Sequence, residues 1–106
     1  YELHDIGIKA ILEKIPDDVN FYITVDADGM DPTIMPAVNA PTPGGLNWLQ
    51  IREFVHGIVK KGRVLGFDLV EISPSFEKGN TTLVHAERLI CNFIGAMVRA
   101  GYYDRK

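Results

Sequence analysis

The fold is decided by two stretches of the 106-residue sequence, Phe-Tyr-Ile-Thr-Val at residues 21–25 and Val-Leu-Gly-Phe-Asp-Leu-Val at residues 64–70. β-branched and aromatic residues dominate the first stretch, and the second is apolar almost throughout, so both are predicted to be buried strands. Continuous apolar strands that alternate with helices are typical of a parallel sheet covered on both faces. The sequence therefore predicts an α/β fold built on a strand, a crossover helix and a second strand.

Three helices are predicted around these strands. The first occupies residues 6–15, where apolar residues recur with helical spacing. The second begins after Asn47, an N-cap whose capping-box partner is Gln50, and ends at Gly62; the third runs over residues 82–100. The positions expected to face the core are Leu49, Phe54, Val55, Ile58 and Val59 in the second helix and Leu83, Ala86, Leu89, Ile90, Phe93, Ile94 and Met97 in the third.

Two strands make an unusually narrow sheet, with both edges unpaired. We therefore expect these strands to be part of a larger parallel sheet in a three-layer α/β/α arrangement. Exposed apolar strand edges promote association between copies of a chain, so a homo-oligomer is expected as well.

Composition narrows the class of protein. Hydrophobic residues make up 46% and charged residues 24%, as in globular proteins. The net charge is −3 and no Lys/Arg-rich face stands out, which argues against a nucleic-acid partner. Because no apolar run approaches the length of a membrane span and no signal pattern is present, we expect no membrane partner and a cytoplasmic location. Cys91 lies in an apolar run and is predicted to be a small core residue.

Carboxylates follow both predicted strands: Asp26 and Asp28 come after the first, and Glu71 after the second. Ligand sites in open α/β sheets gather at the carboxyl ends of the strands. If the strand geometry continues beyond Asp26, both aspartates project to the same side, where a divalent cation such as Mg²⁺ or Mn²⁺ would relieve their repulsion. Alternatively, Asp28 and Asp31 only cap the turn that follows.

Several classes of protein use such a pair of aspartates. An EF-hand loop starting at Asp26 is excluded, because Met30, Asp31 and Ala37 stand where that loop needs an oxygen ligand, a glycine and a glutamate. A glycosyltransferase that holds Mn²⁺ and a nucleotide sugar with an Asp-x-Asp segment stays open. So does a non-catalytic α/β module in which the carboxylates are turn caps.

A longer pattern surrounds the carboxylates. Residues 24–32 read Thr-Val-Asp-Ala-Asp-Gly-Met-Asp-Pro, residues 43–46 read Pro-Gly-Gly-Leu, and residues 68–74 read Asp-Leu-Val-Glu-Ile-Ser-Pro. Together these segments resemble the signatures of the ureohydrolases, the family of arginase, agmatinase and formiminoglutamase, over about residues 21 to 100. The resemblance implies that residues 1–106 are the carboxy-terminal segment of a single ureohydrolase domain.

The resemblance also implies a site and a reaction. Asp26 and Asp28 match the family's metal-binding aspartates, and Glu71 matches the glutamate that binds the guanidinium group of the substrate. The family uses two Mn²⁺ ions to hydrolyse a guanidino compound to urea and an amine. Asn39 and Ala40 stand where arginases carry glycine and threonine. This departure favours an agmatinase-like enzyme acting on agmatine or a related guanidino acid.

Other parts of the family's site have no counterpart in the chain. Its Asp-Ala-His-x-Asp segment and its remaining metal-binding and catalytic histidines are missing, and no residue here is assigned as catalytic. His56 and His85 lie within predicted helices and are expected to be surface or packing residues. We therefore expect the chain to be inactive by itself, with the missing amino-terminal part of the same enzyme as its partner.

Overall fold

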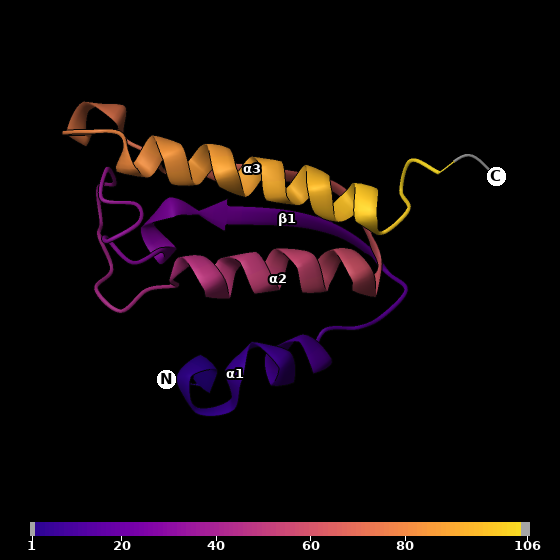
Figure 1. Ribbon diagram of the computed structural model, residues 1–106. Helices are drawn as coiled ribbons and strands as arrows, with labels where there is room; N and C mark the ends of the chain where they lie inside the picture. The colour runs from indigo at the N-terminus through magenta and orange to yellow at the C-terminus, as the bar shows by residue number, and fades with distance from the viewer. Residues whose placement is uncertain (1, 105–106) are drawn as a thin grey trace.

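The computed structural model describes residues 2–104, and its elements follow the predicted order (Figure 1). Each predicted helix and strand is present within a few residues of its expected bounds. The elements are α1 Glu2–Glu13, β1 Asn20–Asp26, the 3₁₀ helix η1 Ala27–Gly29, α2 Trp48–Lys61, β2 Arg63–Val70, the 3₁₀ helix η2 Pro74–Phe76 and α3 Thr81–Arg99.

The two strands form a parallel sheet, which confirms the predicted α/β class. Asn20 lies opposite Arg63 at the start of the sheet, and Asp26 lies opposite Val70 at its end. Parallel strands bring their carboxyl ends to the same edge, so the segments after Asp26 and Val70 emerge together. Figure 1 shows the end of β1, the loop before α2 and the start of α3 at the same end of the molecule.

The two faces of the sheet have different surroundings. On one face, Val25 belongs to the same hydrophobic core as Val55 of α2 and Phe93 of α3. Phe67 of β2 stacks on Phe93 with their ring centroids 4.1 Å apart. On the other face, Tyr22 is 65% exposed. Within residues 2–104, α2 and α3 therefore form one helical layer on one face of the sheet.

α1 packs against α2 rather than against the sheet. Gly57 allows this approach, because a Cβ atom at Gly57 would lie 2.3 Å from Cδ1 of Leu12. α1 is interrupted at Gly7, whose φ of 80° lies in the left-handed region that favours glycine. Among the described residues, no helix is both long and apolar enough to cross a membrane.

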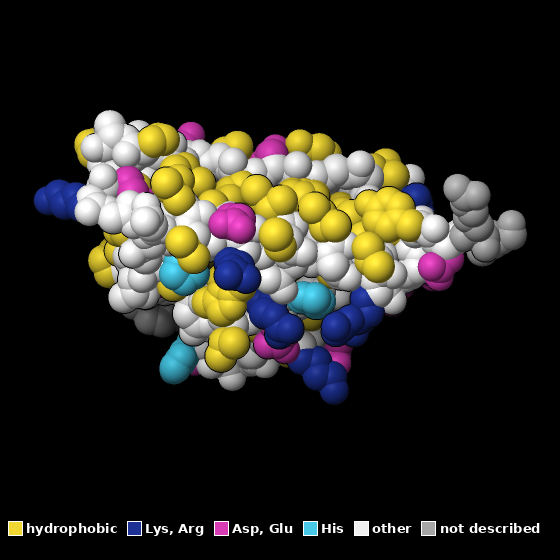
Figure 2. All heavy atoms as spheres, turned by 45° about the horizontal axis from the view of Figure 1, so that its top comes forward, with side chains coloured by type: hydrophobic (Ala, Val, Ile, Leu, Met, Phe, Trp, Pro, Cys, Tyr) yellow, Lys and Arg dark blue, Asp and Glu magenta, His cyan; other side chains and the backbone are white. Residues whose placement is uncertain are grey.

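Four apolar residues predicted to face the core are exposed instead. α2 buries Ile51, Val55 and Val59, and α3 buries a stripe that includes Leu89 and Phe93. The residues that contradict the prediction lie on the flank or far side of these stripes, where nothing in residues 2–104 covers them. They are Leu49, Leu83, Ile90 and Ile94, with exposed fractions of 71%, 47%, 40% and 49%. Figure 2 shows hydrophobic side chains running along the outer surface of α3.

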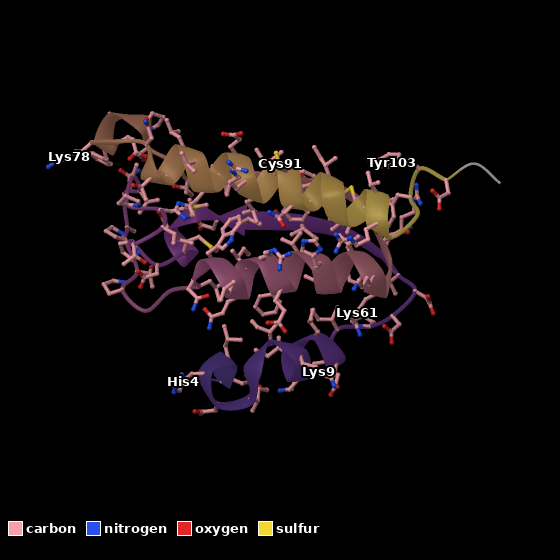
Figure 3. The ribbon with its side chains drawn as sticks, viewed as in Figure 1. His4, Lys9, Lys61, Lys78, Cys91 and Tyr103 are labelled. Atoms are coloured by element: carbon pink, nitrogen blue, oxygen red, sulfur yellow. The ribbon has the colours of Figure 1, made fainter. Side chains whose placement is uncertain are left out.

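Cys91 is exposed, so the predicted core position is wrong. Successive residues of an α-helix are about 100° apart, which places Cys91 about 200° around α3 from the buried Leu89. Figure 3 shows Cys91 on the side of α3 that points away from the sheet. The apolar neighbours in the sequence therefore do not surround it in space.

Candidate functional site

The chain turns sharply where β1 ends. Asp26 caps the short helix η1, because its Oδ1 accepts a hydrogen bond from the backbone N–H of Asp28 at 2.8 Å. The extended geometry through Ala27 that would have pointed both aspartates to the same side is therefore not present. An aspartate commonly competes with strand pairing in this way, because its side chain reaches the N–H two residues ahead.

The two aspartates nevertheless present oxygens of the kind that bind hard divalent cations. Asp28 is partly buried, and its Oδ1 has no hydrogen-bond donor within the described part of the chain. Asp26 is exposed, and within residues 2–104 its carboxylate accepts a single hydrogen bond. A buried carboxylate oxygen without a donor costs free energy unless a proton or a cation reaches it. Mn²⁺ and Mg²⁺ prefer carboxylate oxygens, so the donor set fits such an ion.

The two aspartates do not make a complete metal site. Within residues 2–104, no group of three or more His, Cys, Asp or Glu side chains is arranged to hold a metal ion. A divalent ion with six ligands that is bound by two carboxylates takes its remaining ligands from water or from other protein groups.

Glu71 is placed at the same end of the sheet. It directly follows Val70, the residue that pairs with Asp26, and its side chain is exposed. Its φ of 68° lies in the left-handed region, which is uncommon for a residue other than glycine. Such a backbone costs about 1–3 kcal/mol and persists only where the surroundings hold it; residues of this kind cluster at functional sites.

The two helical histidines are held by neighbours on α2 and α3. Nε2 of His56 lies 3.0 Å from Oδ1 of Asn92. Nδ1 of His85 lies 2.7 Å from the carbonyl oxygen of Thr81, and its ring meets Trp48 edge-on at 5.6 Å. These contacts agree with the prediction that both are surface or packing residues.

Asp31 organises the long loop between η1 and α2. Its Oδ1 accepts hydrogen bonds from the backbone N–H of Thr33 at 2.9 Å and from the Thr33 hydroxyl at 2.6 Å, and its Oδ2 accepts one from the N–H of Gly44 at 2.9 Å. These hydrogen bonds lower the pKa of the Asp31 carboxyl. The bond from the Thr33 hydroxyl has the largest effect, and the two backbone N–H groups add to it. The sequence suggested Asp28 and Asp31 as possible turn caps, and Asp31 does cap the turn.

Asp31→Asn should reduce stability at neutral pH and make stability less dependent on acid. The pKa of Asp31 is lower in the folded chain, so its contribution is present above the unfolded value of about 4 and is lost as the pH falls through the folded value. Thermal melts between about pH 3 and pH 7 measure this. Asp17→Asn, which removes the ion pair between the exposed Asp17 carboxylate and the largely buried Lys61, is the control. If wild type and Asp31→Asn lose the same stability as the pH falls from about 7 to about 3, Asp31 does not have the proposed stabilising role.

Asp68 is the first residue of the segment 68–74 that resembles a family signature, but the sequence suggested no role for it. Its Oδ2 accepts a hydrogen bond from the Tyr22 hydroxyl at 3.0 Å, and this bond raises the pKa of Tyr22. Its Oδ1 is buried and lacks a donor among the described residues. A further signal in the sequence is that Asp68 is an acidic residue inside an otherwise apolar strand.

An apolar pocket of ≈ 310 Å³ opens between β1 and α2, beside Asp26. Its walls come from the consecutive residues 23–26 of β1, from Gly29 and the loop after η1, and from α2. The lining residues include Ile23, Val25, Met30, Leu46, Ile51 and Phe54. The sequence did not predict this pocket, because its walls come from segments that are far apart in the chain.

Comparison with known proteins adds independent information. The chain is 34% identical to the N(1)-aminopropylagmatine ureohydrolase of Thermus thermophilus over an alignment of 113 positions, which covers 100% of this chain and 36% of that protein. It is 30% identical over 98 residues to the agmatinase of Chromobacterium violaceum, covering 90% of this chain and 30% of that protein. The chain thus spans about a third of the length of these curated relatives.

The fold is also similar to solved structures. The agmatine ureohydrolase of Thermoplasma volcanium superposes with a TM-score of 0.81 at 31% identity, over 99% of this chain and 35% of that protein. The family model described as "Arginase family" matches residues 1–95. By its sequence and by its fold, this chain belongs to the arginase family of ureohydrolases.

Proposed function

We propose that this chain supplies two metal ligands, Asp26 and Asp28, and one substrate-binding residue, Glu71, to an enzyme that hydrolyses a guanidino compound to urea and an amine. The observation that carries the proposal is the buried, unpartnered Oδ1 of Asp28 next to Asp26, at the sheet end shared with Glu71. Membership in the arginase family supports this reading. Family membership argues against the glycosyltransferase and against the non-catalytic module, although Asp26 and Asp31 do cap turns as that module would require.

Each residue has a role that follows from its chemistry. Asp26 and Asp28 offer carboxylate oxygens, and Oδ1 of Asp28 gains the partner that it lacks in residues 2–104. When bound, a pair of Mn²⁺ ions would lower the pKa of water enough to make hydroxide available at neutral pH. The Glu71 carboxylate would accept charge-assisted hydrogen bonds from the guanidinium N–H groups. Such a contact would orient the carbon atom, a poor electrophile, for attack.

The proposed substrate is a linear guanidino compound, agmatine or a related guanidino acid. Two of the similar proteins are named for agmatine and one for N(1)-aminopropylagmatine. Asn39 and Ala40 are exposed in the loop beside the site. Because Ala40 has no hydroxyl, this loop offers fewer hydrogen bonds to an α-amino acid group than the arginase pattern does.

The remaining parts of the site would come from the amino-terminal part of the same domain, since the similar proteins are about three times as long as this chain. That part would also cover the open face of the sheet and widen the sheet beyond two strands. We further propose that the enzyme is a cytoplasmic homo-oligomer. The support for association is the apolar outer surface of α3 (Figure 2), and light scattering measures it.

The activity can be tested with the longest polypeptide that the reading frame of this chain encodes. Purified with Mn²⁺, it should release urea from agmatine or guanidinobutyrate, and more slowly from arginine. The same assay without metal and with excess chelator is the control. If this polypeptide contains all the metal-site residues and still releases no urea from any guanidino compound, the proposal is contradicted.

The 106-residue chain alone should bind Mn²⁺ weakly. With only Asp26 and Asp28 as ligands, the ion would keep most of its waters, so the dissociation constant should lie in the range of about 10⁻⁴–10⁻³ M typical of weak oxygen-ligand sites. Isothermal titration calorimetry measures it, with Asp28→Asn as the matched variant. Submicromolar binding to the monomeric chain would contradict the two-ligand site.

A further inference from the structure

The backbone of Ala37 is held from both sides by residues that are distant in the sequence. Its N–H donates to Oγ1 of Thr82 at 2.9 Å, and its carbonyl oxygen accepts from the N–H of Ser73 at 2.8 Å. Ala37 itself is fully buried. The loop before α2, the segment after β2 and the first turn of α3 are therefore joined at one residue, which we call the Ala37 clamp.

Thr82 occupies a position that the packing of α3 does not explain. Its exposed fraction is 0%, and it is the one polar or charged residue among those described that is fully enclosed. A buried hydroxyl costs free energy unless it is hydrogen-bonded, so an apolar residue would suit the core side of α3 better. The hydrogen bond from the N–H of Ala37 satisfies the Thr82 hydroxyl. We conclude that this hydroxyl serves to hold the loop that contains Ala37 rather than to stabilise α3.

The clamp lies directly beyond the strained residue Glu71. Ser73 is two residues after Glu71, and Ile72 between them packs against the core. With Ile72 and Ser73 anchored, the chain connects β2 to η2 through the left-handed backbone at Glu71. If the anchor at Ser73 were released, Glu71 could return to an ordinary negative φ, and its carboxylate would move relative to Asp26.

We infer that Thr82 is a positioning residue that acts through Ala37 and Ser73 to hold the Glu71 carboxylate where a guanidinium group is bound. The inference rests on the proposed function for the role of Glu71, whereas the clamp itself rests on the hydrogen bonds alone. Within residues 2–104, the Thr82 side chain is hydrogen-bonded to Ala37 and not to the proposed metal ligands or Glu71, so its effect should appear in substrate binding and not in metal binding.

The test compares Thr82→Val, which keeps the shape but removes the acceptor, with Thr82→Ser, which keeps the hydroxyl. Thr81→Val, at an exposed neighbour, is the control for the helix terminus. In the longest encoded polypeptide, Thr82→Val should raise KM for the guanidino substrate about 10-fold, the scale of one lost hydrogen bond to a buried group. The value of kcat should change less, Mn²⁺ affinity should stay the same, and Thr82→Ser and Thr81→Val should resemble wild type.

Two readouts do not depend on activity. Thr82→Val should speed amide hydrogen exchange at Ala37 by about 10-fold or more. It should also change the NMR coupling constant that reports φ at Glu71. If Thr82→Val does not fold, Ser73→Pro, which removes the second donor, replaces it. Loss of protection at Ala37 with an unchanged Glu71 coupling and unchanged KM would overturn the positioning role. Failure of wild type to release urea would instead overturn the proposed function, while the coupling would still report the clamp.

Discussion

Replacing Asp28 with alanine should abolish metal-dependent urea release by the longest polypeptide that carries this chain, lowering kcat/KM by more than about 100-fold. Residues that only support a metal ligand cost about 10–100-fold when changed, so a direct ligand should exceed that range. The buried Oδ1 of Asp28 has no other partner in residues 2–104 that could account for its position. Metal content by mass spectrometry and initial rates with saturating Mn²⁺ measure the two consequences separately.

Matched variants separate this effect from a general loss of structure. His85→Ala removes a titratable side chain whose contacts are with Trp48 and Thr81, so activity should be largely kept. Glu71→Gln should leave the metal content unchanged and raise KM, because the amide keeps the shape but loses the charge that attracts guanidinium. An Asp28→Ala protein with normal metal content and normal rates would exclude Asp28 as a ligand. Equal loss of activity in His85→Ala would point to unfolding instead.

The 106-residue chain, purified alone, should release no urea above background from agmatine, arginine or guanidinobutyrate, even with excess Mn²⁺. Enzymes commonly turn over about 1–10³ times per second, so the expected difference from an intact enzyme is several orders of magnitude. The reason is the incomplete donor set: two aspartates cannot fix two metal ions and the attacking water in one geometry. A coupled urea assay on chain whose fold has been verified by circular dichroism measures this.

The longest encoded polypeptide, assayed side by side, is the positive control. Measurable turnover by the 106-residue chain would mean that the missing histidines are dispensable, and the assignment of its carboxylates would then have to change. A chain that becomes active only on association would show a rate that rises with a power of concentration greater than one. That result would also contradict the prediction, because it would complete the site without an additional segment.

Local signals in the sequence were sufficient for the helices and strands. The capping box at the start of α2 is present, since Asn47 and Gln50 exchange hydrogen bonds of 2.9 and 3.0 Å between side chain and backbone. These groups are three residues apart, so their interaction depends on the chain nearby. The β-branched and aromatic residues of β1 likewise predicted a buried strand; Val25 is buried as expected, whereas the side that carries Tyr22 is exposed.

Exposure of apolar residues on α3 could not be predicted in this way. Ile90 and Cys91 are as apolar as the buried Leu89, and the pattern gave all three the same environment. A helix that is apolar around most of its circumference can present any side to the core, and only its neighbours decide which side is covered. In residues 2–104 those neighbours are the sheet and α2.

The sequence by itself predicted that Asp26, Asp28 and Glu71 lie at one end of the sheet, because parallel strands joined by a helix must place their carboxyl ends together. Only the tertiary structure decided what surrounds them. The turn at Asp26, the unpartnered oxygen of Asp28 and the Ala37 clamp depend on backbone conformation and on contacts between distant segments. Ala37 and Thr82 are 45 residues apart, and a single hydrogen bond over that separation leaves no periodic pattern in the sequence from which it could be predicted.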